Sequence, residues 1–360
     1  MEMKGAPGVS LKGLSSLPYV TPGLPGVGGR LKERPDHFVV EETPAYEPNG
    51  EGPHLFVNLT KEGLTTREVQ RGLAALFDLP VGAVSFAGLK DKHARATQTF
   101  SLFVGEVHPD FPSHALELIN ARLPVNAHWA RPHRRKIKAG HLRGNRFRVT
   151  ISGVELGMDE AIERARRIAD RLREKGAPNY YGPQRIGVAG ENATRGLEII
   201  RGGLSVGNRW LRRFLVSSYL DHLCNRYLAR RVERGAFERI LEGDVAKKHS
   251  TGGMFLVEDA EREQPRYLTQ EISFTAPIFG PKMWETRGQA RELEGDILGD
   301  EGVTLERLGE LGVRGTRRLG RILPDLSVEV SEEGLVLRFT LPKGAYATTV
   351  LREVMKTPDY

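Results

Sequence analysis

Strand-like alternation occurs near both ends of this 360-residue chain, whereas helical periodicity dominates the middle. Apolar side chains alternate in residues 38–41 and 55–59, as in strands with a buried face. After a long helical region, the same alternation returns from Ser327, in residues 328–330 and 335–341. Strands from both ends of a chain can share one sheet only if the segment between them leaves and re-enters the domain. The order therefore predicts an α+β fold in which one domain carries an inserted second domain.

The helical expectations come from capping residues and periodicity. Thr65 and Glu68 have the spacing of a capping box, which predicts a helix whose buried side chains are Val69, Leu73 and Leu76. Residues 159–175 place apolar side chains on one side and mostly charges opposite. The segment 177–187 follows Gly176 and is rich in residues that break helices and strands. It marks the start of a second, helix-rich region. Beyond it, we expect helices over residues 210–232, 286–298 and 347–354.

The most defined acidic position is Asp91, which lies in the turn Lys90-Asp91-Lys92 between two strand-like segments. Upstream, Val84, Phe86 and Leu89 are expected to anchor the turn, and the downstream strand at 99–104 is expected to bury one face. Rigid scaffolds often hold reactive groups at such connections. The alternative is an exposed turn with screened ion pairs of little energetic value. Residue patterning alone leaves both readings open.

Positive charge is concentrated in residues 128–148, here called the basic stretch, within a chain of net charge +7. Trp129 and Phe147 are interleaved with its cations, and the stretch contains no acidic residue. Its eight cations are Arg131, Arg134, Arg135, Lys136, Lys138, Arg143, Arg146 and Arg148. Such a stretch either solubilises a surface or binds a polyanion with release of counterions. We expect RNA, because the sequence has no zinc-finger spacing and no clear helix-turn-helix pattern.

Other classes of protein are disfavoured by composition. Charged residues make up 28% of the chain and no run of 18 apolar residues occurs, so we expect a soluble globular protein without a membrane span. The N-terminus lacks the apolar region of a secretory signal, and the single Cys224 cannot form an internal disulfide. The histidines do not have metal-site spacing, and the glycine-rich residues 26–29 do not match a dinucleotide fingerprint. We therefore expect no metal and a cytoplasmic location.

Five segments of the chain resemble the TruD-type tRNA pseudouridine synthases, and they occur in the family's order from end to end. They are Leu31-Lys32 to Pro35 with Phe38 and Glu41, then Ser85–Ala94, Gly144–Phe147, Pro178–Gly187, and Leu341–Thr348 with Arg352-Glu353. The resemblance implies a pseudouridine synthase catalytic domain, residues 1–177 and 321–360, with a mixed, largely antiparallel sheet. It also implies an inserted, helix-rich α/β domain at residues 178–320, which agrees with the helix-rich region that the sequence predicts after Gly176.

The resemblance assigns roles to individual residues. Asp91 matches the catalytic aspartate, and Lys32 matches a family lysine near the site. The uridine pocket is implied by a set of matching positions, namely Phe38, Asn145, Tyr346 and, at the motif's aromatic position, Phe147. The departures are that His37 stands where the family often has an acid, and that Tyr181 and Tyr346 stand where Phe is common. These departures concern substrate preference, because none of them involves Asp91.

The chemistry suits these residues. Isomerising uridine breaks one glycosidic bond and forms another without net electron transfer, so we expect no cofactor. Asp91 would attack the sugar or the base, while Lys90 or Lys92 would keep it ionised or face phosphate. The flipped base would stack on aromatic side chains. Phe38 and Phe147 also fit ordinary core packing, since both lie in strand patterns.

The family's usual substrate is tRNA, at the uridine of position 13 in the D-arm. Further RNA contacts are expected from Arg134, Arg135 and Lys136, and from Gln184 and Arg185, whose loop equally suits a structural hinge. We expect a monomer without an obligate protein partner, because two domains of one chain suffice for a site. Two alternatives are a non-catalytic RNA-binding module and another RNA-modifying enzyme, such as a base hydrolase or a methyltransferase. A methyltransferase would need a cofactor-binding loop after an early strand, and the sequence shows no such motif.

Overall fold

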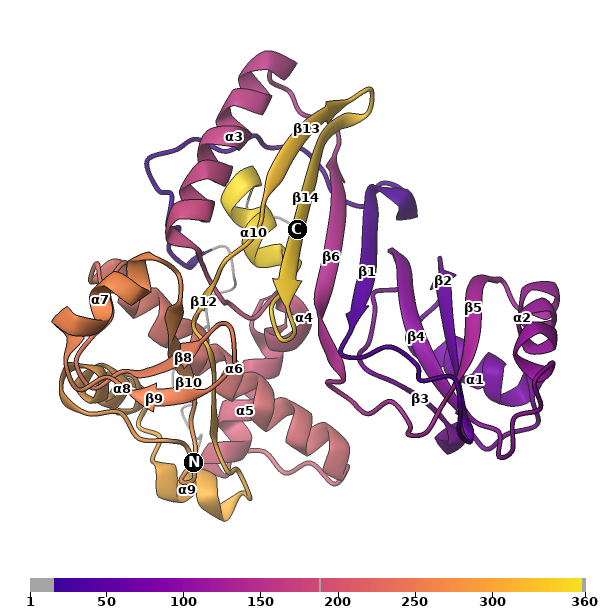
Figure 1. The fold of residues 1–360 in the computed structure, drawn as a ribbon. Coiled ribbons are helices and arrows are strands. Elements are labelled where there is room, and N and C mark those ends of the chain that lie inside the picture. The colour runs from indigo at the N-terminus through magenta and orange to yellow at the C-terminus, as the bar shows by residue number, and fades with distance from the viewer. Residues whose placement is uncertain (1–15, 188, 358–360) are drawn as a thin grey trace, which may run out of the picture. The chain divides into compact units, whose positions relative to one another are not determined.

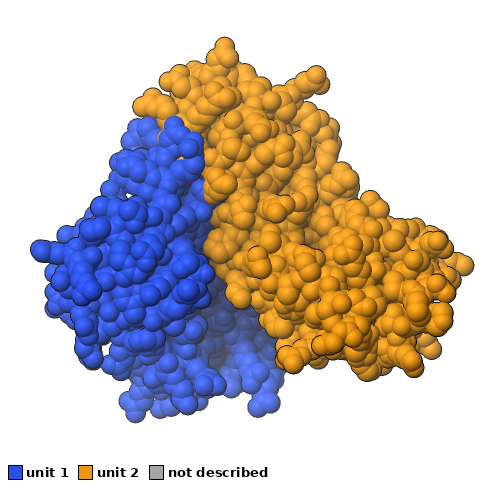
Figure 2. Space-filling view, viewed as in Figure 1, with its two compact units in different colours: residues 1–26, 170–324, 345–360 blue, residues 27–169, 325–344 orange. Residues whose placement is uncertain are grey.

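The computed structural model describes residues 16–187 and 189–357 (Figure 1). The chain folds into two compact units, which are coloured separately in Figure 2. Unit 1 comprises residues 1–26, 170–324 and 345–360, and unit 2 comprises residues 27–169 and 325–344. Unit 2 joins segments that are distant in sequence, as the order of strands predicted for the domain that holds the sheet. Unit 1 also joins separate segments, which was not predicted for the inserted domain. A division into compact units does not locate an insertion point, so the domain boundaries at 178 and 320 remain a prediction.

Unit 2 is built on an eight-stranded sheet. Its strands are β1 (Phe38–Pro44), β2 (His54–Lys61), β3 (Val84–Phe86), β4 (Arg95–Phe103), β5 (Val125–His133), β6 (Leu142–Ile151), β13 (Ser327–Ser331) and β14 (Gly334–Pro342). Its helical segments are η2 (Pro35–His37), α1 (Thr66–Leu76), η3 (Val81–Ala83), α2 (Phe111–Arg122) and the first part of α3 (Met158–Lys175). The predicted strands near both ends of the chain thus belong to one sheet.

The strand order in this sheet is β13-β14-β6-β1-β4-β2-β5, with β3 added beside β4. Only β1 and β4 run parallel, with Val40 opposite Ala96, and the other pairs are antiparallel. This confirms the α+β fold with a mixed, largely antiparallel sheet. In Figure 1, β1 lies between β6 and β4, so the strand that begins at Phe38 is central in the sheet.

One hydrophobic core of unit 2 lies where α1 and α2 pack against the sheet. Leu55, Val57 and Leu59 of β2 point into it together with Val69 and Leu73 of α1. The capping box that predicts α1 is present: the Thr65 side chain accepts from the Glu68 amide, and the Glu68 carboxylate accepts from the Thr65 amide. Each residue thereby satisfies a helix N-terminal donor. The prediction of this helix is confirmed.

The expectation that β4 buries a single face is wrong. Thr99 and Ser101 are buried, as are Phe100 and Leu102 on the opposite face. The reason is position in the sheet, since β4 pairs with β1, β2 and β3 and is not an edge strand. Period-two alternation shows which residues share a face, whereas burial of the second face depends on tertiary packing.

Unit 1 combines helices with a four-stranded antiparallel sheet of order β11-β10-β8-β9. Its helices are the end of α3, α4 (Pro183–Ile186), α5 (Glu191–Arg201), α6 (Arg209–Glu233), α7 (Ala260–Leu268), α8 (Gly288–Glu301), α9 (Leu305–Glu310) and α10 (Ala347–Met355). Its strands are β7 (Ala177–Pro178), β8 (Val245–Lys248), β9 (Met254–Leu256), β10 (Ile272–Ile278), β11 (Thr316–Leu319) and β12 (Arg321–Ile322). The predicted helices over 210–232, 286–298 and 347–354 correspond to α6, α8 and α10.

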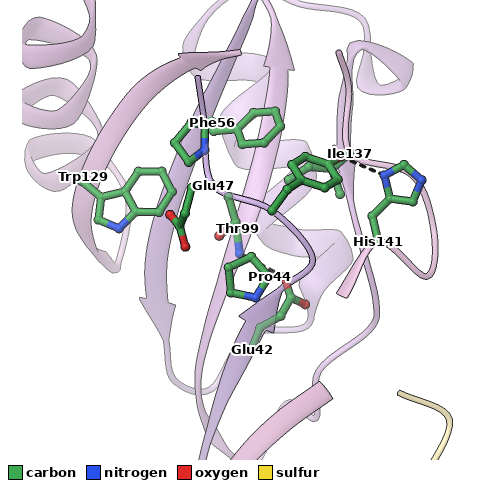
Figure 3. A pocket seen from close by; sticks show the side chains of 10 residues that line it. Glu42, Pro44, Glu47, Phe56, Thr99, Trp129, Ile137 and His141 are labelled. Carbon is green, nitrogen blue, oxygen red and sulfur yellow. Dashed lines mark hydrogen bonds between the residues drawn. The ribbon is translucent and has the colours of Figure 1, made fainter. Parts of the chain in front are cut away.

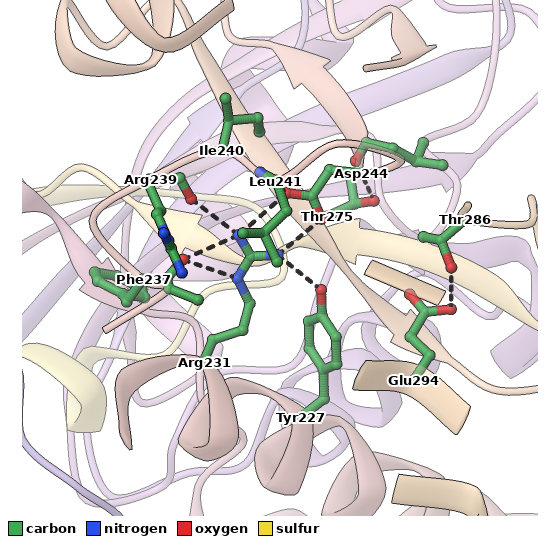
Figure 4. Close-up of polar contacts among 12 residues, drawn as sticks. Tyr227, Arg231, Phe237, Arg239, Ile240, Leu241, Asp244, Thr275, Thr286 and Glu294 are labelled. Carbon is green, nitrogen blue, oxygen red and sulfur yellow. Dashed lines mark hydrogen bonds and ion pairs between the residues drawn. The ribbon is translucent and has the colours of Figure 1, made fainter. Parts of the chain in front are cut away.

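A buried ion pair lies in unit 1 (Figure 4). Arg231 of α6 donates through two nitrogens to the carboxylate of Asp244, at 2.7 and 3.1 Å, and both side chains are fully buried. The remaining donors of Arg231 bind the carbonyl oxygens of Ala236 and Arg239 and the hydroxyl of Tyr227. A buried guanidinium is tolerated when its donors are satisfied in this way. The network ties the end of α6 to the segment that leads into β8.

No helix within the part of the chain that the structure describes is long and apolar enough to cross a membrane.

Candidate active site

Asp91 lies in the loop between β3 and β4, as predicted. The main chain of this loop is held at several points by buried or half-buried polar groups. The Gln98 side chain donates to the carbonyl oxygen of Gly88 at 3.3 Å, and the Thr66 hydroxyl accepts from the Lys90 amide at 2.9 Å. Leu89, which was expected to anchor the turn, is instead 69% exposed. Polar contacts to the main chain therefore hold this part of the loop.

The Asp91 carboxylate forms an ion pair with Lys32. The Lys32 ammonium donates to Oδ2 of Asp91, and the His93 amide donates to Oδ1 at 3.0 Å. Burial would raise the pKa of the Asp91 carboxyl, yet these hydrogen bonds and the Lys32 charge hold the pKa below its ordinary value. Asp91 is therefore ionised at neutral pH. The expectation that Lys90 or Lys92 supplies this charge is wrong: Lys90 pairs elsewhere and Lys92 is exposed.

Two interactions beside Asp91 were not anticipated. Lys61, fully buried at the end of β2, donates to the carbonyl oxygen of Asp91 at 2.6 Å. Lys90 donates to Glu42 of β1 at 2.6 Å, and only 5% and 2% of these two side chains are exposed. Burial lowers the pKa of Lys61 to about 8, although the charge of Asp91 opposes this change. The main chain around the Asp91 carboxylate is thus fixed by buried charges.

Strand periodicity held a signal for both residues. Lys61 continues the buried series Leu55, Val57 and Leu59, and Glu42 continues the series Phe38 and Val40 on β1. A charged residue at the next inward position of a buried strand face requires a partner, because an unpaired buried charge is costly. The sequence could have marked Lys61 and Glu42 on this ground, although it could not have identified what they contact.

Phe38 and Phe147 lie beside Lys32 at the same sheet face. Their rings meet edge to face with centroids 6.1 Å apart, and Phe147 stacks on Phe339 at 5.1 Å. The Lys32 ammonium lies 4.7 Å from the centroid of the Phe38 ring. Phe38 is buried and Phe147 is partly buried, so both pack in the protein, while Lys32 contacts both the Phe38 ring and Asp91. Lys32 also adopts a left-handed backbone with φ 58°, which is uncommon for a non-glycine residue.

Asn145 is brought to this face by strand register. It lies opposite Glu42 of β1 and Leu341 of β14, and Val40 lies opposite Phe147. Residues paired across strands share a face, so Asn145 and Phe147 face the same side as Glu42. The side-chain oxygen of Asn145 is buried and accepts no hydrogen bond from any residue that the structure describes. Such an atom requires a donor, and a bound ligand can supply one.

A small pocket lies at the opposite end of β1 from Phe38 (Figure 3). Glu42, Pro44 and Thr99 line it together with Trp129 and Phe56. Its internal volume of about 10 Å³ leaves room for about one water molecule. The hydrogen bond in Figure 3 joins the hydroxyl of Tyr46 to Nδ1 of His141 at 2.8 Å. The pocket is too small for a nucleobase.

Three further predicted site residues, Tyr346, Gln184 and Arg185, belong to unit 1. Arg185 donates to Asp221 at 2.8 Å and to the Ser217 hydroxyl at 2.7 Å, whereas Gln184 is exposed on the short helix α4. Among residues 16–187 and 189–357, no group of three or more His, Cys, Asp or Glu side chains could hold a metal ion.

The basic stretch does not form one continuous strip on the sheet. Its first part lies on β5, its middle in the loop 134–141 and its last part on β6, and three strands separate β5 from β6. Arg134, Arg135 and Lys136 lie together in the loop and are exposed, and Arg134 forms an ion pair with Glu51. The loop therefore presents the three cations as a local cluster.

Comparisons with known proteins identify the family. The sequence model of the family described as "tRNA pseudouridine synthase D (TruD)" matches residues 15–206 and 200–354. The chain is 45% identical over 340 residues to tRNA pseudouridine synthase D of Thermus thermophilus, covering 94% of this chain and 92% of that protein. It is 40% identical over 351 residues to the protein of that name from Anaeromyxobacter dehalogenans, covering 95% and 97%.

A solved structure shares the fold over nearly the whole chain. It is the crystal structure of the putative tRNA pseudouridine synthase D (TruD) from Methanosarcina mazei, which has a TM-score of 0.75 and 25% sequence identity and covers 95% of this chain and 96% of that one. The fold is that of a pseudouridine synthase. The chain belongs to the TruD family.

Proposed function

We propose that this protein, a tRNA pseudouridine synthase, uses Asp91 as its nucleophile on the uridine at position 13 in the D-arm of tRNA. The observation that carries the assignment of Asp91 is its ion pair with Lys32, in a loop held by Lys61 and by Glu42 through Lys90. A nucleophilic carboxylate must be ionised and fixed in place, and these contacts meet both requirements. Position 13 comes from the family resemblance.

The reaction balances without a co-reactant. The bond between N1 of uracil and C1′ of the ribose breaks, the base turns over, and a bond forms between C5 and C1′. C5 then loses its proton and N1 gains one, so the product is an isomer of the substrate. Asp91 attacks either C1′ or the base, and in both cases the carboxylate leaves when the product forms. The positive charge of Lys32 stays beside Asp91 both when the carboxylate attacks and when it leaves, so it offsets part of the change in charge on Asp91.

We assign the uridine pocket to Phe38, Asn145 and Phe147 in unit 2, with Lys32 beside them. Extruding a base from its stack costs a few kcal/mol, and stacking on an aromatic ring recovers about 1–3 kcal/mol for a fully engaged base. The unsatisfied oxygen of Asn145 suits an N–H donor on the base edge. Tyr346 is assigned to the same pocket on the family resemblance alone.

The remaining assignments are also part of this proposal. The catalytic domain comprises residues 1–177 and 321–360, and the inserted domain comprises residues 178–320. The exposed cations Arg134, Arg135 and Lys136 contact tRNA phosphates, and Gln184 and Arg185 are further candidates. The protein acts as a monomer in the cytoplasm. It uses no cofactor, because an isomerisation of this kind needs none.

The test is to map pseudouridine chemically in tRNA transcripts after incubation with wild-type protein and with Asp91→Ala. We expect modification of position 13 by the wild type and none by the variant. A transcript with cytidine at position 13 is the matched substrate control and should remain unmodified. Modification of a different uridine would overturn the site preference, and equal modification by both proteins would reject Asp91 as the nucleophile.

The alternative, a non-catalytic RNA-binding module, is distinguished in the same experiment. Such a module would bind the transcript and form no pseudouridine with either protein. The ion pair between Lys32 and Asp91 does not favour this alternative, since RNA binding alone gains nothing from a fixed carboxylate that repels phosphate.

A further inference from the structure

A tryptophan stands exposed at the start of the long helix of unit 1. Trp210 is in the first turn of α6 (Arg209–Glu233), after the N-cap residue Asn208, and 71% of it is exposed. Tryptophan is highly buried on average, since its large apolar surface is costly to leave in water. An exposed tryptophan in a polar surrounding therefore requires an explanation.

Trp210 is the outer member of a series of neighbouring planar groups. Its ring lies parallel to that of Phe214, with centroids 5.6 Å apart and an interplanar angle of 6°. The guanidinium of Arg185 follows, 5.6 Å from the Phe214 ring and 6.0 Å from the Tyr181 ring. Tyr181 contacts Tyr346 at 5.5 Å. We call these five residues the stacking series; it runs within unit 1 from Trp210 to the residue that the family resemblance assigns to the uridine pocket.

The stacking series is held in place by α6. Trp210, Phe214, Ser217 and Asp221 recur at helical spacing, so they form one stripe along the helix. Asp221 is buried and binds the guanidinium of Arg185 at 2.8 Å, while Ser217 accepts from it at 2.7 Å. Arg185 is thereby held next to the rings of Phe214 and Tyr181. A stacking partner for Trp210 would meet a preformed support and not a mobile side chain.

Positive charge surrounds the exposed end of the series. Arg209, Arg212 and Arg213 share the first turns of α6 with Trp210, and all three are exposed. None of the three forms an ion pair with another described residue, and residues 201–220 contain no acid. An aromatic ring among unneutralised arginines matches a nucleotide, whose base stacks and whose phosphate is anionic. It does not match an ordinary protein interface, whose core is depleted in charge.

We propose that Trp210 stacks on an unpaired base of the tRNA substrate, while Arg209, Arg212 and Arg213 bind the neighbouring phosphates. This inference rests on the proposed function for the identity of the RNA. It assigns to unit 1 a base-stacking contact that is separate from the chemistry at Asp91. On this inference Arg185, named above as a candidate RNA contact, instead supports the platform from within the protein, as does Tyr181.

The test measures binding in a protein that cannot modify its substrate. Trp210→Ala and Trp210→Phe are each made in the Asp91→Ala background, and the Kd for an unmodified tRNA transcript is measured by fluorescence anisotropy. Trp210→Ala should weaken binding about 10-fold, as loss of one stacked base does, and Trp210→Phe should stay within about 3-fold. Because the readout is binding, it does not depend on whether Asp91 is the nucleophile.

The matched control is Trp284→Ala, which removes the other exposed tryptophan of unit 1, 46% exposed. Its Kd should equal that of the Asp91→Ala parent. The proposal is overturned if Trp210→Ala binds as tightly as the parent, or if Trp210→Phe binds as weakly as Trp210→Ala. Circular dichroism of each variant establishes that the comparison is between folded proteins.

Three further readouts separate stacking from other causes. Saturating tRNA should quench tryptophan emission less in Trp210→Phe than in the parent, because a stacked base quenches the indole; equal quenching would contradict the contact. Replacing Arg209, Arg212 and Arg213 with Gln should lower the slope of log Kd against log salt by about 2, whereas Trp210→Ala should leave it unchanged. If Trp210→Ala changes the sedimentation coefficient and not the Kd, the surface joins protein copies and the proposal is wrong.

Discussion

The Lys32 ammonium donates to one oxygen of the Asp91 carboxylate, and the His93 amide donates to the other. Each oxygen of Asp91 therefore has a described donor, and its geometry is fixed from two sides. Lys32 belongs to the segment before β1, 59 residues away in sequence. A single ion pair thus joins the segment that leads into the sheet to the loop of Asp91 and keeps the carboxylate charged.

Removing the Lys32 charge should shift the acidic limb of the pH–activity profile to higher pH. In Lys32→Met, burial acts on Asp91 without the opposing ion pair, so the pKa of its carboxyl should rise; a neighbouring cation typically moves a carboxyl pKa by about 1–3. Activity that needs the carboxylate would then be lost at a higher pH as the solution is acidified. The measurement is kcat/KM against pH, with Lys92→Met as the control for an exposed lysine next to Asp91. An acidic limb identical to that of the wild type would refute the assignment.

The same ion pair makes the stability of the folded protein depend on pH. The pKa of Asp91 is lower in the folded protein than in the unfolded chain, so its contribution is present above the unfolded value of about 3.9 and is lost as pH falls through the folded value.

Glu42 should act as a positioning residue through Lys90. Glu42→Gln leaves a buried ammonium without its counter-charge, which costs about 3–5 kcal/mol of unfolding free energy. The loop should shift, so kcat should fall on the order of 10-fold with little change in KM. Urea denaturation and steady-state kinetics measure the two effects.

Two variants control this prediction. Glu41→Gln removes the exposed neighbouring acid and should change neither quantity. Glu42→Leu combined with Lys90→Met removes both buried charges, so it should recover much of the stability while kcat stays low. A double variant with normal kcat would show that the ion pair has no role in placing Asp91.

Lys61 should make stability depend on pH in the alkaline range. Its pKa of about 8 in the folded protein lies below the ordinary value of 10.5, so the protonated form is disfavoured by folding. Between about pH 8 and 10.5 the unfolded chain binds more protons, and stability rises with pH by up to about 1.4 kcal/mol per unit. The measurable quantity is the difference in unfolding free energy between wild type and Lys61→Met. That difference should move in favour of the wild type as the solution becomes more alkaline through this range, and a constant difference would contradict the prediction.

The loop cations should contribute to tRNA binding through phosphates. Neutralising Arg134, Arg135 and Lys136 together should weaken binding and lower the salt slope of log Kd by about 2. The charge-matched control replaces three exposed arginines outside the loop: Arg122, Arg166 and Arg167. An unchanged slope in the loop variant would remove these residues from the interface.

Local patterns were sufficient to predict the elements that hold the site. Alternation located β1, β2 and β14, the capping box located α1, and the turn that carries Asp91 was placed correctly between two strands. These features depend on nearest neighbours in sequence, which is why they could be predicted. The family motifs added the candidate nucleophile and the mixed sheet.

Partners across the fold could not be predicted in the same way. The ion pair of Lys90 was expected at Asp91 because the two are adjacent, but Lys90 turns to Glu42 on β1, and Lys32 takes its place. Leu89 was expected to anchor the turn because it is apolar, but it is exposed in a loop held by polar contacts. Contacts between distant strands depend on sheet order, which alternation does not specify.

The most direct test of Asp91 as the nucleophile is single-turnover release of the C5 hydrogen from tRNA labelled with tritium at C5 of uridine. Wild-type protein and Asp91→Asn are compared in excess over tRNA, with the exposed Asp110→Asn as control. We expect release by the wild type and by Asp110→Asn, and none by Asp91→Asn even though this variant still binds tRNA. Tritium release by Asp91→Asn at the wild-type rate would contradict a nucleophilic role for this carboxylate.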